Sequence, residues 1–286
     1  MEKIKIAWCQ SSSQGSLVKN HLFYLNQCRE LALHGAELIF LPELFLWDYI
    51  CIEEKIHHFD QAIPLDHPCI EEYRSLAREF KICLFLPIFE KRAEGLYHNT
   101  ILSIGVSGET LDLYRKMHLP HDNSFYEKYY FTPGDRGFRV VETPKLKVGT
   151  LICWDQWFPE AARLTAMQGA ELLYYPTAIA WDMNEPDECY EDQLESWKTI
   201  LRSHSIANNV FTLAVNRIGT EKHLQFWGNS LLSNPIGRVM EQLIIEPQKP
   251  IVEITLREIG EHRKAWPFFR DRRIDEYKGL TQRWLD

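Results

Sequence analysis

Runs of apolar residues with the length of buried strands recur along the chain. They are rich in Ile, Val, Leu and aromatic residues. They cover residues 5–10, 37–41, 81–89, 98–104, 110–115, 138–141, 148–153, 172–176, 211–215 and 251–255. Short, almost continuous apolar runs are typical of strands that are covered on both faces. The pattern therefore predicts extensive β structure enclosed by other elements.

Helical patterns lie between several of these strands. They span residues 17–33, 70–80, 159–168 and 191–208. Pro159 at the first position and Gly169 beyond the last turn bracket the third of these helices. Short loops at 107–109 and 143–145 join neighbouring strands as hairpins. The order begins as βαβ and continues with hairpins, which predicts an α/β layered fold with mixed sheets.

The domain organisation follows from length and composition. The 286 residues are 45% hydrophobic and 25% charged, which is typical of folded globular proteins. Neither a Pro/Gly/Ser-rich linker nor a fixed-period repeat divides the sequence, so we expect one domain over residues 1–286. Residues 261–286 combine apolar side chains such as Trp266 and Phe269 with a charged run at 270–273. This segment is predicted to be an arm that packs on a second subunit.

Charge and cysteine content limit the function classes. The net charge of −8 provides no basic face for nucleic acid and favours cationic small molecules at long range. The charged N-terminal residues do not resemble a signal peptide, and every apolar run is too short to cross a membrane. The seven cysteines are irregularly spaced, which fits reduced thiols. We therefore expect a cytoplasmic protein with neither a nucleic-acid nor a membrane partner.

Cys153 is the strongest candidate for chemistry. It follows the apolar run 148–152 and precedes the start of a predicted helix, so it lies where a strand delivers a side chain onto a turn. Backbone N–H groups at a helix N-terminus favour a thiolate and can hold an oxyanion. The alternative is a small hydrophobic residue that ends a core strand.

Two further ionisable residues occupy comparable positions. Glu43 follows the strand at 37–41, and Lys116 follows the strand at 110–115. The ends of strands in an open α/β sheet form the edge where ligands bind. A thiol nucleophile needs a proton acceptor, and an oxyanion needs a positive partner. Each residue alone is more typical of a solvated surface than of a catalytic site.

The motifs around these three residues resemble those of the nitrilase superfamily of carbon–nitrogen hydrolases, over essentially the whole chain. The matching motifs are Leu-Pro-Glu at 41–43, Tyr-Arg-Lys at 114–116 with His-Leu-Pro at 118–120, and Ile-Cys-Trp-Asp at 152–155. The chain is most similar to the N-carbamoylputrescine amidase branch, through residues 153–163, 175–179, 216–219 and 270–278. The resemblance implies a four-layer αββα fold with two mixed sheets. It also implies an αββα–αββα homodimer, often assembled further, without cofactor or metal.

The resemblance also implies roles for the site residues. Glu43 is the general base and later the general acid, and Cys153 is the nucleophile. The Lys116 ammonium and the Trp154 backbone N–H stabilise the oxyanion. Glu127 matches the second glutamate of the family, which orients the lysine and the substrate. Its alternative interpretation is a surface salt bridge to a neighbour such as Lys128.

The resembled branch implies a cationic ureido substrate, N-carbamoylputrescine, cleaved to putrescine, CO2 and NH3 in polyamine synthesis. An acidic residue must then meet the substrate ammonium, because an unpaired buried charge is costly. Asp182 is the aligned position, with Glu185 as the alternative, and Tyr49 and Trp154 are candidate walls for the aliphatic chain.

Other interpretations stay open. N-carbamoyl amino acids such as N-carbamoyl-β-alanine require an Arg fork, which the acidic stretch 181–188 argues against. A catalytically silent binding scaffold is a second alternative, and a Cys/His protease a more distant one. His118 and His121 have the H-x-x-H spacing of a zinc site, but no ligand set completes it. We therefore expect these histidines to make structural hydrogen bonds.

Overall fold

The computed structural model describes residues 3–285, which form two six-stranded sheets. The first has the order β15-β1-β2-β3-β4-β5, from β15 (Ile251–Ile254), β1 (Ile4–Trp8), β2 (Leu38–Phe40), β3 (Cys83–Ala93), β4 (Leu96–Ile104) and β5 (Thr110–Arg115). The second has the order β14-β13-β10-β8-β7-β6, from β14 (Val239–Gln242), β13 (Leu231–Ser233), β10 (Phe211–Val215), β8 (Leu172–Pro176), β7 (Lys147–Thr150) and β6 (Arg139–Glu142). Both sheets contain parallel and antiparallel pairs.

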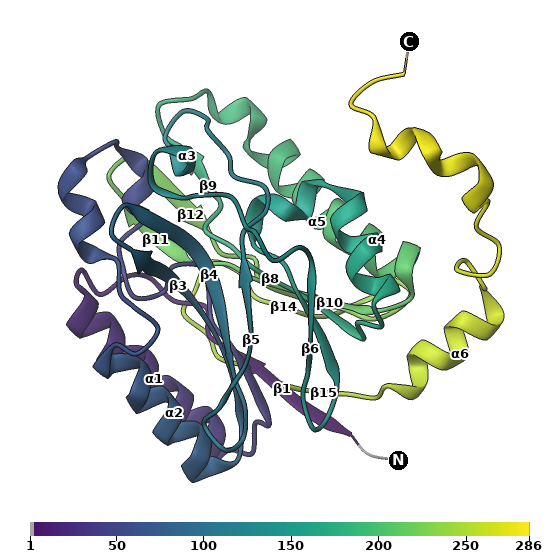
Figure 1. Cartoon of the computed structure of the whole chain (residues 1–286), viewed down its shortest axis with the longest axis horizontal. Helices are drawn as coiled ribbons and strands as arrows, with labels where there is room; N and C mark the ends of the chain where they lie inside the picture. The colour runs from purple at the N-terminus through teal and green to yellow at the C-terminus, as the bar shows by residue number, and fades with distance from the viewer. Residues whose placement is uncertain (1–2, 286) are drawn as a thin grey trace.

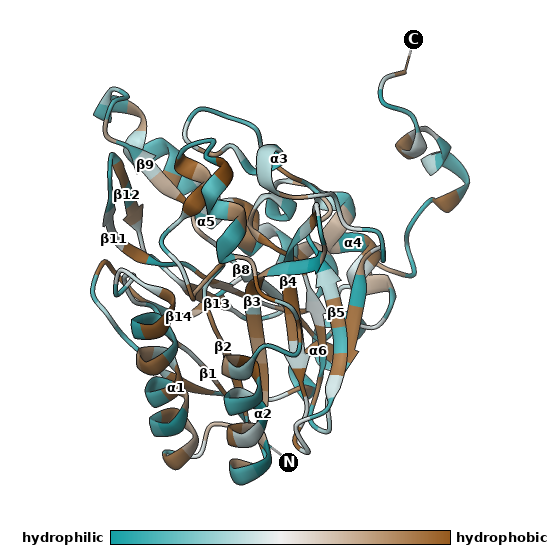
Figure 2. Ribbon diagram, turned by 60° about the vertical axis from the view of Figure 1, so that its left-hand side comes forward, coloured by the Kyte–Doolittle hydropathy of each residue, from teal (hydrophilic) through white to brown (hydrophobic). Residues whose placement is uncertain are grey.

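Two helices cover the outer face of each sheet (Figure 1). They are α1 (Leu17–Leu33) and α2 (Pro68–Phe80) on the first sheet, and α4 (Pro159–Met167) and α5 (Tyr190–Asn208) on the second. Apolar residues concentrate in the strands between these helices, as Figure 2 shows. The result is the predicted four-layer αββα arrangement. The αββα–αββα dimer stays a prediction.

Strand alternation assigns the side chains to the two cores. In β1, Ile6 and Trp8 enter the core between the sheets, while Ala7 points toward α1 and α2. Between the sheets, the Phe40 ring lies 4.7 Å from the Tyr174 ring. The Tyr174 hydroxyl donates a hydrogen bond to the carbonyl of Leu41. This contact fixes the end of β2 against the second sheet.

Several smaller elements escaped the sequence patterns. A third sheet has the order β11-β12-β9, from β11 (Ile218–Glu221), β12 (Leu224–Trp227) and β9 (Ala180–Asp182). Single turns of helix occur at η1 (Ile50–Ile52), α3 (Glu127–Tyr130), η3 (Cys153–Trp157) and η4 (Asp187–Cys189), and a longer 3-10 segment forms η2 (Ile56–Gln61). The strand predicted at 148–153 ends at Thr150, because Cys153 already belongs to η3.

The C-terminal segment departs from the body of the protein. After α6 (Arg257–Ala265), the chain runs outward to η5 (Ile274–Thr281) (Figure 1). Trp266 and Trp284 are among its exposed apolar side chains. Its predicted contact with a second subunit stays a prediction, as does the single-domain assignment. Within the described residues, all helices are too short or too polar to cross a membrane.

Candidate active site

The three predicted catalytic residues meet at one edge of the two sheets. Glu43 follows β2, Lys116 directly follows β5, and Cys153 begins η3 just after β7. All three side chains are buried; Cys153, at 6% exposure, is the most accessible of them. They come from both sheets, so the site depends on how the sheets stack.

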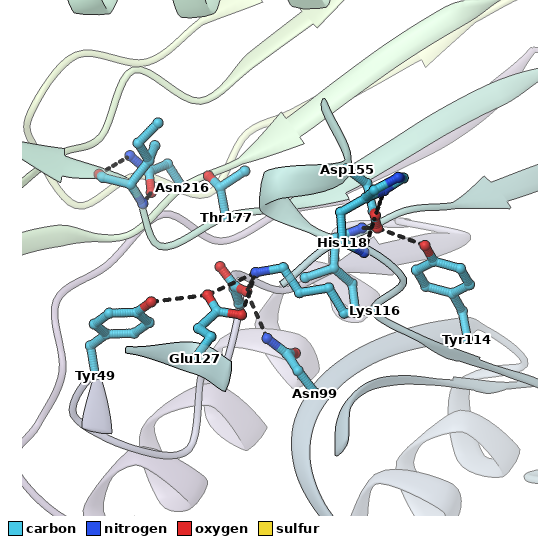
Figure 3. Close-up of polar contacts among 12 residues, drawn as sticks. Tyr49, Asn99, Tyr114, Lys116, His118, Glu127, Asp155, Thr177 and Asn216 are labelled. Atoms are coloured by element: carbon cyan, nitrogen blue, oxygen red, sulfur yellow. Dashed lines mark hydrogen bonds and ion pairs between the residues drawn. The ribbon is translucent and has the colours of Figure 1, made fainter. Parts of the chain in front are cut away.

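The Lys116 ammonium is the centre of the polar network (Figure 3). Its Nζ donates to Glu43 Oε1 at 2.8 Å and to both oxygens of Glu127 at 2.8 and 2.7 Å. Asn99 Nδ2 donates to the same Glu43 oxygen at 2.7 Å. Burial alone would lower the pKa of Lys116, but Glu127 and Glu43 outweigh it and hold that pKa well above its ordinary value. The ammonium therefore stays charged.

The second carboxylate oxygen of Glu43 has no hydrogen-bond partner among the described residues. Glu43 Oε2 is buried and makes no hydrogen bond to a described residue, whereas Oε1 is held by Lys116 and Asn99. Unpaired buried carboxylate oxygens are uncommon in folded proteins, and a catalytic role is one explanation for them. Glu43 also raises the pKa of the Cys153 thiol, so the two groups are electrostatically coupled. This oxygen is suited to accept the thiol proton.

Glu127 belongs to the buried network and not to the surface. It lies in α3 with 1% exposure, which excludes the alternative of a solvated salt bridge to Lys128. The Tyr49 hydroxyl donates to Glu127 Oε1 at 3.0 Å. Burial raises the pKa of Glu127 to about 7, with Glu43 adding to this and with Lys116 and Tyr49 opposing it. Tyr49 thus lies behind Glu127 and does not line the cavity at Cys153, where we expected it.

The backbone at Cys153 is strained, as in a nucleophile turn. Its φ of 40° lies in the left-handed region, which residues with a β-carbon rarely adopt. The net effect of the surroundings on Cys153 opposes the thiolate that a helix start by itself would favour. Burial and the neighbouring Glu43 raise the pKa of Cys153 well above its ordinary value, and this outweighs the lowering by Lys116 and by the Ala178 backbone. These surroundings favour the thiol form of Cys153 over the thiolate.

Asp155 is a site residue to which sequence reasoning gave no role. It is fully buried and accepts hydrogen bonds from the Ile152 N–H at 2.8 Å, the Tyr114 hydroxyl at 2.6 Å, and the His118 N–H and Nδ1 at 3.1 and 2.7 Å. Tyr114 and His118 flank Lys116 in the sequence, and Ile152 precedes Cys153; Figure 3 shows Asp155 beside Tyr114 and His118. Asp155 therefore ties the lysine segment to the nucleophile turn. Its place within the Cys153 motif was the available signal.

Of the two histidines of the H-x-x-H pattern, His118 makes the predicted structural hydrogen bond, and His121 lies near Glu54 at the surface. His118 Nδ1 bonds Asp155, as expected of a structural hydrogen bond, and its ring stacks on Phe158 with centroids 3.8 Å apart. His121 Nε2 lies 3.9 Å from Glu54 Oε1. Residues 3–285 contain no group of three or more His, Cys, Asp or Glu side chains that could hold a metal ion.

A cavity of about 660 Å³ leads to Cys153. Trp154 and Trp157 line it near the thiol, and its acidic side chains are Glu127, Asp122, Asp182, Glu185 and Asp192. The described residues that line it include neither Lys nor Arg. Both predicted anchors lie in this wall, Asp182 buried and Glu185 exposed. A larger cavity of about 830 Å³ near Trp47 lacks the thiol, so we place the site in the smaller one.

Comparisons with known proteins agree with this geometry. The family model for carbon-nitrogen hydrolase matches residues 5–264. N-carbamoylputrescine amidase of Oryza sativa subsp. japonica is 38% identical over 88% of this chain and 86% of its own. Citrullinase of Francisella tularensis is 34% identical over 99% of this chain and 100% of its own. The crystal structure of a carbon-nitrogen hydrolase from Helicobacter pylori G27 superposes with a TM-score of 0.96 at 37% identity, covering 99% and 100% of the two chains.

Replacing the base should stop turnover without unfolding the protein. Glu43→Gln removes the proton acceptor while Gln can still fill the space beside Lys116 and Asn99. We expect kcat to fall by about 10²- to 10⁴-fold, measured as ammonia release. Glu94→Gln, on a side chain that is 87% exposed, is the matched control and should retain wild-type kcat. A kcat within tenfold of wild type for Glu43→Gln would exclude Glu43 as the base.

The pH profile should report the Tyr49–Glu127 contact. The Tyr49 hydroxyl lowers the pKa of Glu127, so Tyr49→Phe should raise it further above about 7. The carboxylate that holds Lys116 would then form only at higher pH. Since a hydrogen bond contributes roughly 1 kcal/mol, the acidic limb of kcat should move up by roughly 0.5 to 1 pH unit. The control is Tyr129→Phe, because the Tyr129 ring is exposed and lies in α3 with Glu127; it should leave the acidic side of the pH profile unchanged. If Tyr49→Phe also leaves the acidic side of the profile unchanged, Tyr49 does not lower the pKa of Glu127.

Proposed function

This chain belongs to the carbon–nitrogen hydrolase family and is a hydrolase of non-peptide carbon–nitrogen bonds, and from that membership we propose that it hydrolyses N-carbamoylputrescine. The products would be putrescine, CO2 and NH3, and the reaction would serve polyamine synthesis. The observation that carries the proposal is the acidic cavity that ends at Cys153. An elongated substrate would place its ureido group at the thiol and its ammonium among the carboxylates.

The first half of the reaction uses the buried cluster. Glu43 takes the thiol proton as Cys153 Sγ attacks the ureido carbonyl carbon, so thiolate charge develops only during attack. The Lys116 ammonium and the Trp154 backbone N–H stabilise the oxyanion of the tetrahedral intermediate. Such donors are typically worth roughly 3–4 kcal/mol each. The geometry that supports this step is the 2.8 Å contact between Lys116 and Glu43, which keeps acceptor and cation side by side.

The second half returns the proton and releases the enzyme. Collapse of the tetrahedral intermediate breaks a carbon–nitrogen bond, and Glu43 gives its proton to the departing nitrogen. A thioester-type intermediate remains on Cys153. Glu43 then removes a proton from water, which attacks the same carbon; collapse of this second tetrahedral intermediate breaks the carbon–sulfur bond, and Glu43 returns the proton to the Cys153 sulfur. The carbamic acid that is released loses CO2 and frees the second nitrogen, so NH3 and putrescine have both left, in either order. Glu127 keeps Lys116 oriented throughout.

The far end of the cavity supports a cationic substrate. An ammonium buried without a partner would lose several kcal/mol of hydration, and Asp182 or Glu185 supplies the opposite charge. Citrulline, the substrate named for the Francisella relative, carries a carboxylate beside its ammonium. N-carbamoyl-β-alanine carries a carboxylate alone. Because Lys and Arg are missing from the described lining, neither carboxylate would find a cationic partner there.

We also expect a homodimer or larger homo-oligomer in the cytoplasm. The exposed apolar side chains after α6, among them Ile274 and Trp284, support a second copy as the partner of residues 261–286. The described cysteines are all unpaired thiols, which fits a reducing compartment. The complete Glu43–Lys116–Cys153 cluster argues against a silent scaffold, because a binding protein would not need to keep a charged lysine buried.

Substrate preference tests the proposal. Ammonia release would be measured with N-carbamoylputrescine, citrulline and N-carbamoyl-β-alanine, with Cys153→Ala as the blank. We expect kcat/KM for N-carbamoylputrescine to exceed the other two by about 100-fold or more, because a misplaced carboxylate leaves buried charges unpaired. Preference for either carboxylate-bearing urea would overturn the substrate assignment. If none of the three compounds is hydrolysed, the substrate is another amide or the protein is a catalytically silent scaffold.

A further inference from the structure

Asp182 is held from behind by two residues that do not line the cavity. Ser124 Oγ donates a hydrogen bond to Asp182 Oδ2 at 2.9 Å, and His223 Nε2 lies 2.7 Å from the same Ser124 oxygen. His223 Nε2 is also 3.8 Å from Asp182 Oδ2. The other carboxylate oxygen, Oδ1, accepts from the Asn184 N–H at 2.9 Å. Both oxygens of this side chain are therefore directed by the protein.

The order of donors in this cluster is fixed by its chemistry. The Ser124 hydroxyl has one proton, and that proton goes to the Asp182 carboxylate, which only accepts. His223 Nε2 must then carry a hydrogen and donate it to the Ser124 oxygen. The donors run from His223 through Ser124 to Asp182, and they end on the carboxylate that faces the cavity. Ser124 is thus not a nucleophile, despite its contact with a histidine.

Three segments that are distant in sequence must meet to form this cluster. Asp182 ends β9, His223 lies in the turn between β11 and β12, and Ser124 belongs to the loop before α3. Asp182 and Leu224 are cross-strand partners, which fixes the histidine turn beside the carboxylate. Ser124 is 3% exposed and adopts a left-handed φ of 65°. Such backbone strain in a non-glycine residue persists only where surrounding contacts enforce it.

We propose that Ser124 and His223 are positioning residues that set the preference of this site for an ammonium-bearing urea. They act through Asp182 by fixing its carboxylate toward the cavity, so their loss weakens binding of the cationic end and leaves the chemistry at Cys153 intact. This inference rests on the proposed function, because it takes N-carbamoylputrescine as the substrate. It adds a specificity determinant on β9 and its neighbours that is separate from the Glu43–Lys116–Cys153 cluster.

The test compares two ureas of equal length. N-carbamoylputrescine ends in an ammonium, and n-pentylurea has a methyl group in the same place. Ser124→Ala should raise KM for N-carbamoylputrescine about tenfold, as expected for loss of a hydrogen bond to a charged group, with kcat within about twofold. The KM of n-pentylurea, or its inhibition constant if it is not cleaved, should stay unchanged.

Ser124→Gly separates the hydroxyl from the backbone. Ser124→Ala removes only the hydroxyl and keeps the strained left-handed φ. Ser124→Gly removes the hydroxyl together with the β-carbon and relieves that strain, because glycine accepts the left-handed φ freely. Both should show the same rise in KM. If Ser124→Gly behaves like wild type while Ser124→Ala does not, the loop conformation and not the hydrogen bond would be responsible, and the proposal would fail.

His223 provides the second arm. The amide nitrogen of His223→Gln can donate to Ser124 in place of Nε2 and should restore a near wild-type KM, whereas His223→Leu should raise it as Ser124→Ala does. If every variant changes the KM of N-carbamoylputrescine and that of n-pentylurea by the same factor, Ser124 and His223 have only a structural role and the proposal fails. Failure of the wild-type enzyme to cleave N-carbamoylputrescine would instead reject the proposed function, so the two failures remain distinguishable.

Discussion

The site depends on one buried ammonium held between two carboxylates. Lys116 is 1% exposed; burial lowers its pKa, and Glu127 and Glu43 more than offset that lowering. Removing one partner from such a buried ion cluster typically costs roughly 3–5 kcal/mol. The three groups lie just after β2, just after β5 and in α3, so the fold must place these elements accurately. This arrangement fixes the positive charge of Lys116 beside Cys153.

The same environment determines the state of the nucleophile. Burial and Glu43 both raise the pKa of the Cys153 thiol, so in the proposed reaction the thiol gives up its proton during attack. This explains why a buried carboxylate oxygen without a hydrogen bond is tolerated beside it. Asp155 makes the arrangement rigid, since it binds residues on both sides of Lys116 and the backbone that precedes Cys153. Preorganisation of this kind costs no rearrangement during the reaction.

Sequence reasoning was most successful where a local pattern carries the information. The helix predicted at 17–33 has the same bounds in the structure, and the hairpin loops at 107–109 and 143–145 were also located. Strand-end positions predicted that Glu43, Lys116 and Cys153 would share one edge. The third sheet was missed because its strands are only three or four residues long. An apolar pattern of that length cannot be told from a loop.

Contacts between distant segments lay beyond such patterns. Tyr49 was expected as a cavity wall, yet its hydroxyl binds Glu127, 78 positions away. Ser124 and His223 belong to no recognisable sequence motif. Their contacts with Asp182 depend on the packing of the loop before α3 against the β11–β12 hairpin. The net pKa shift of Cys153 also depends on groups outside its own segment. Local sequence indicates a helix start that favours the thiolate, but the degree of burial depends on the packing of both sheets.

The protonation state of Cys153 is the most direct test of this account. Thiolate absorbance near 240 nm would be titrated in the wild-type protein and in Cys153→Ser, and the difference would isolate this one thiol. The account predicts that the difference remains absent through neutral pH and develops only above the ordinary cysteine value of about 8.5. A step in the difference below pH 7 would show a preformed thiolate, and would contradict proton transfer to Glu43 during attack.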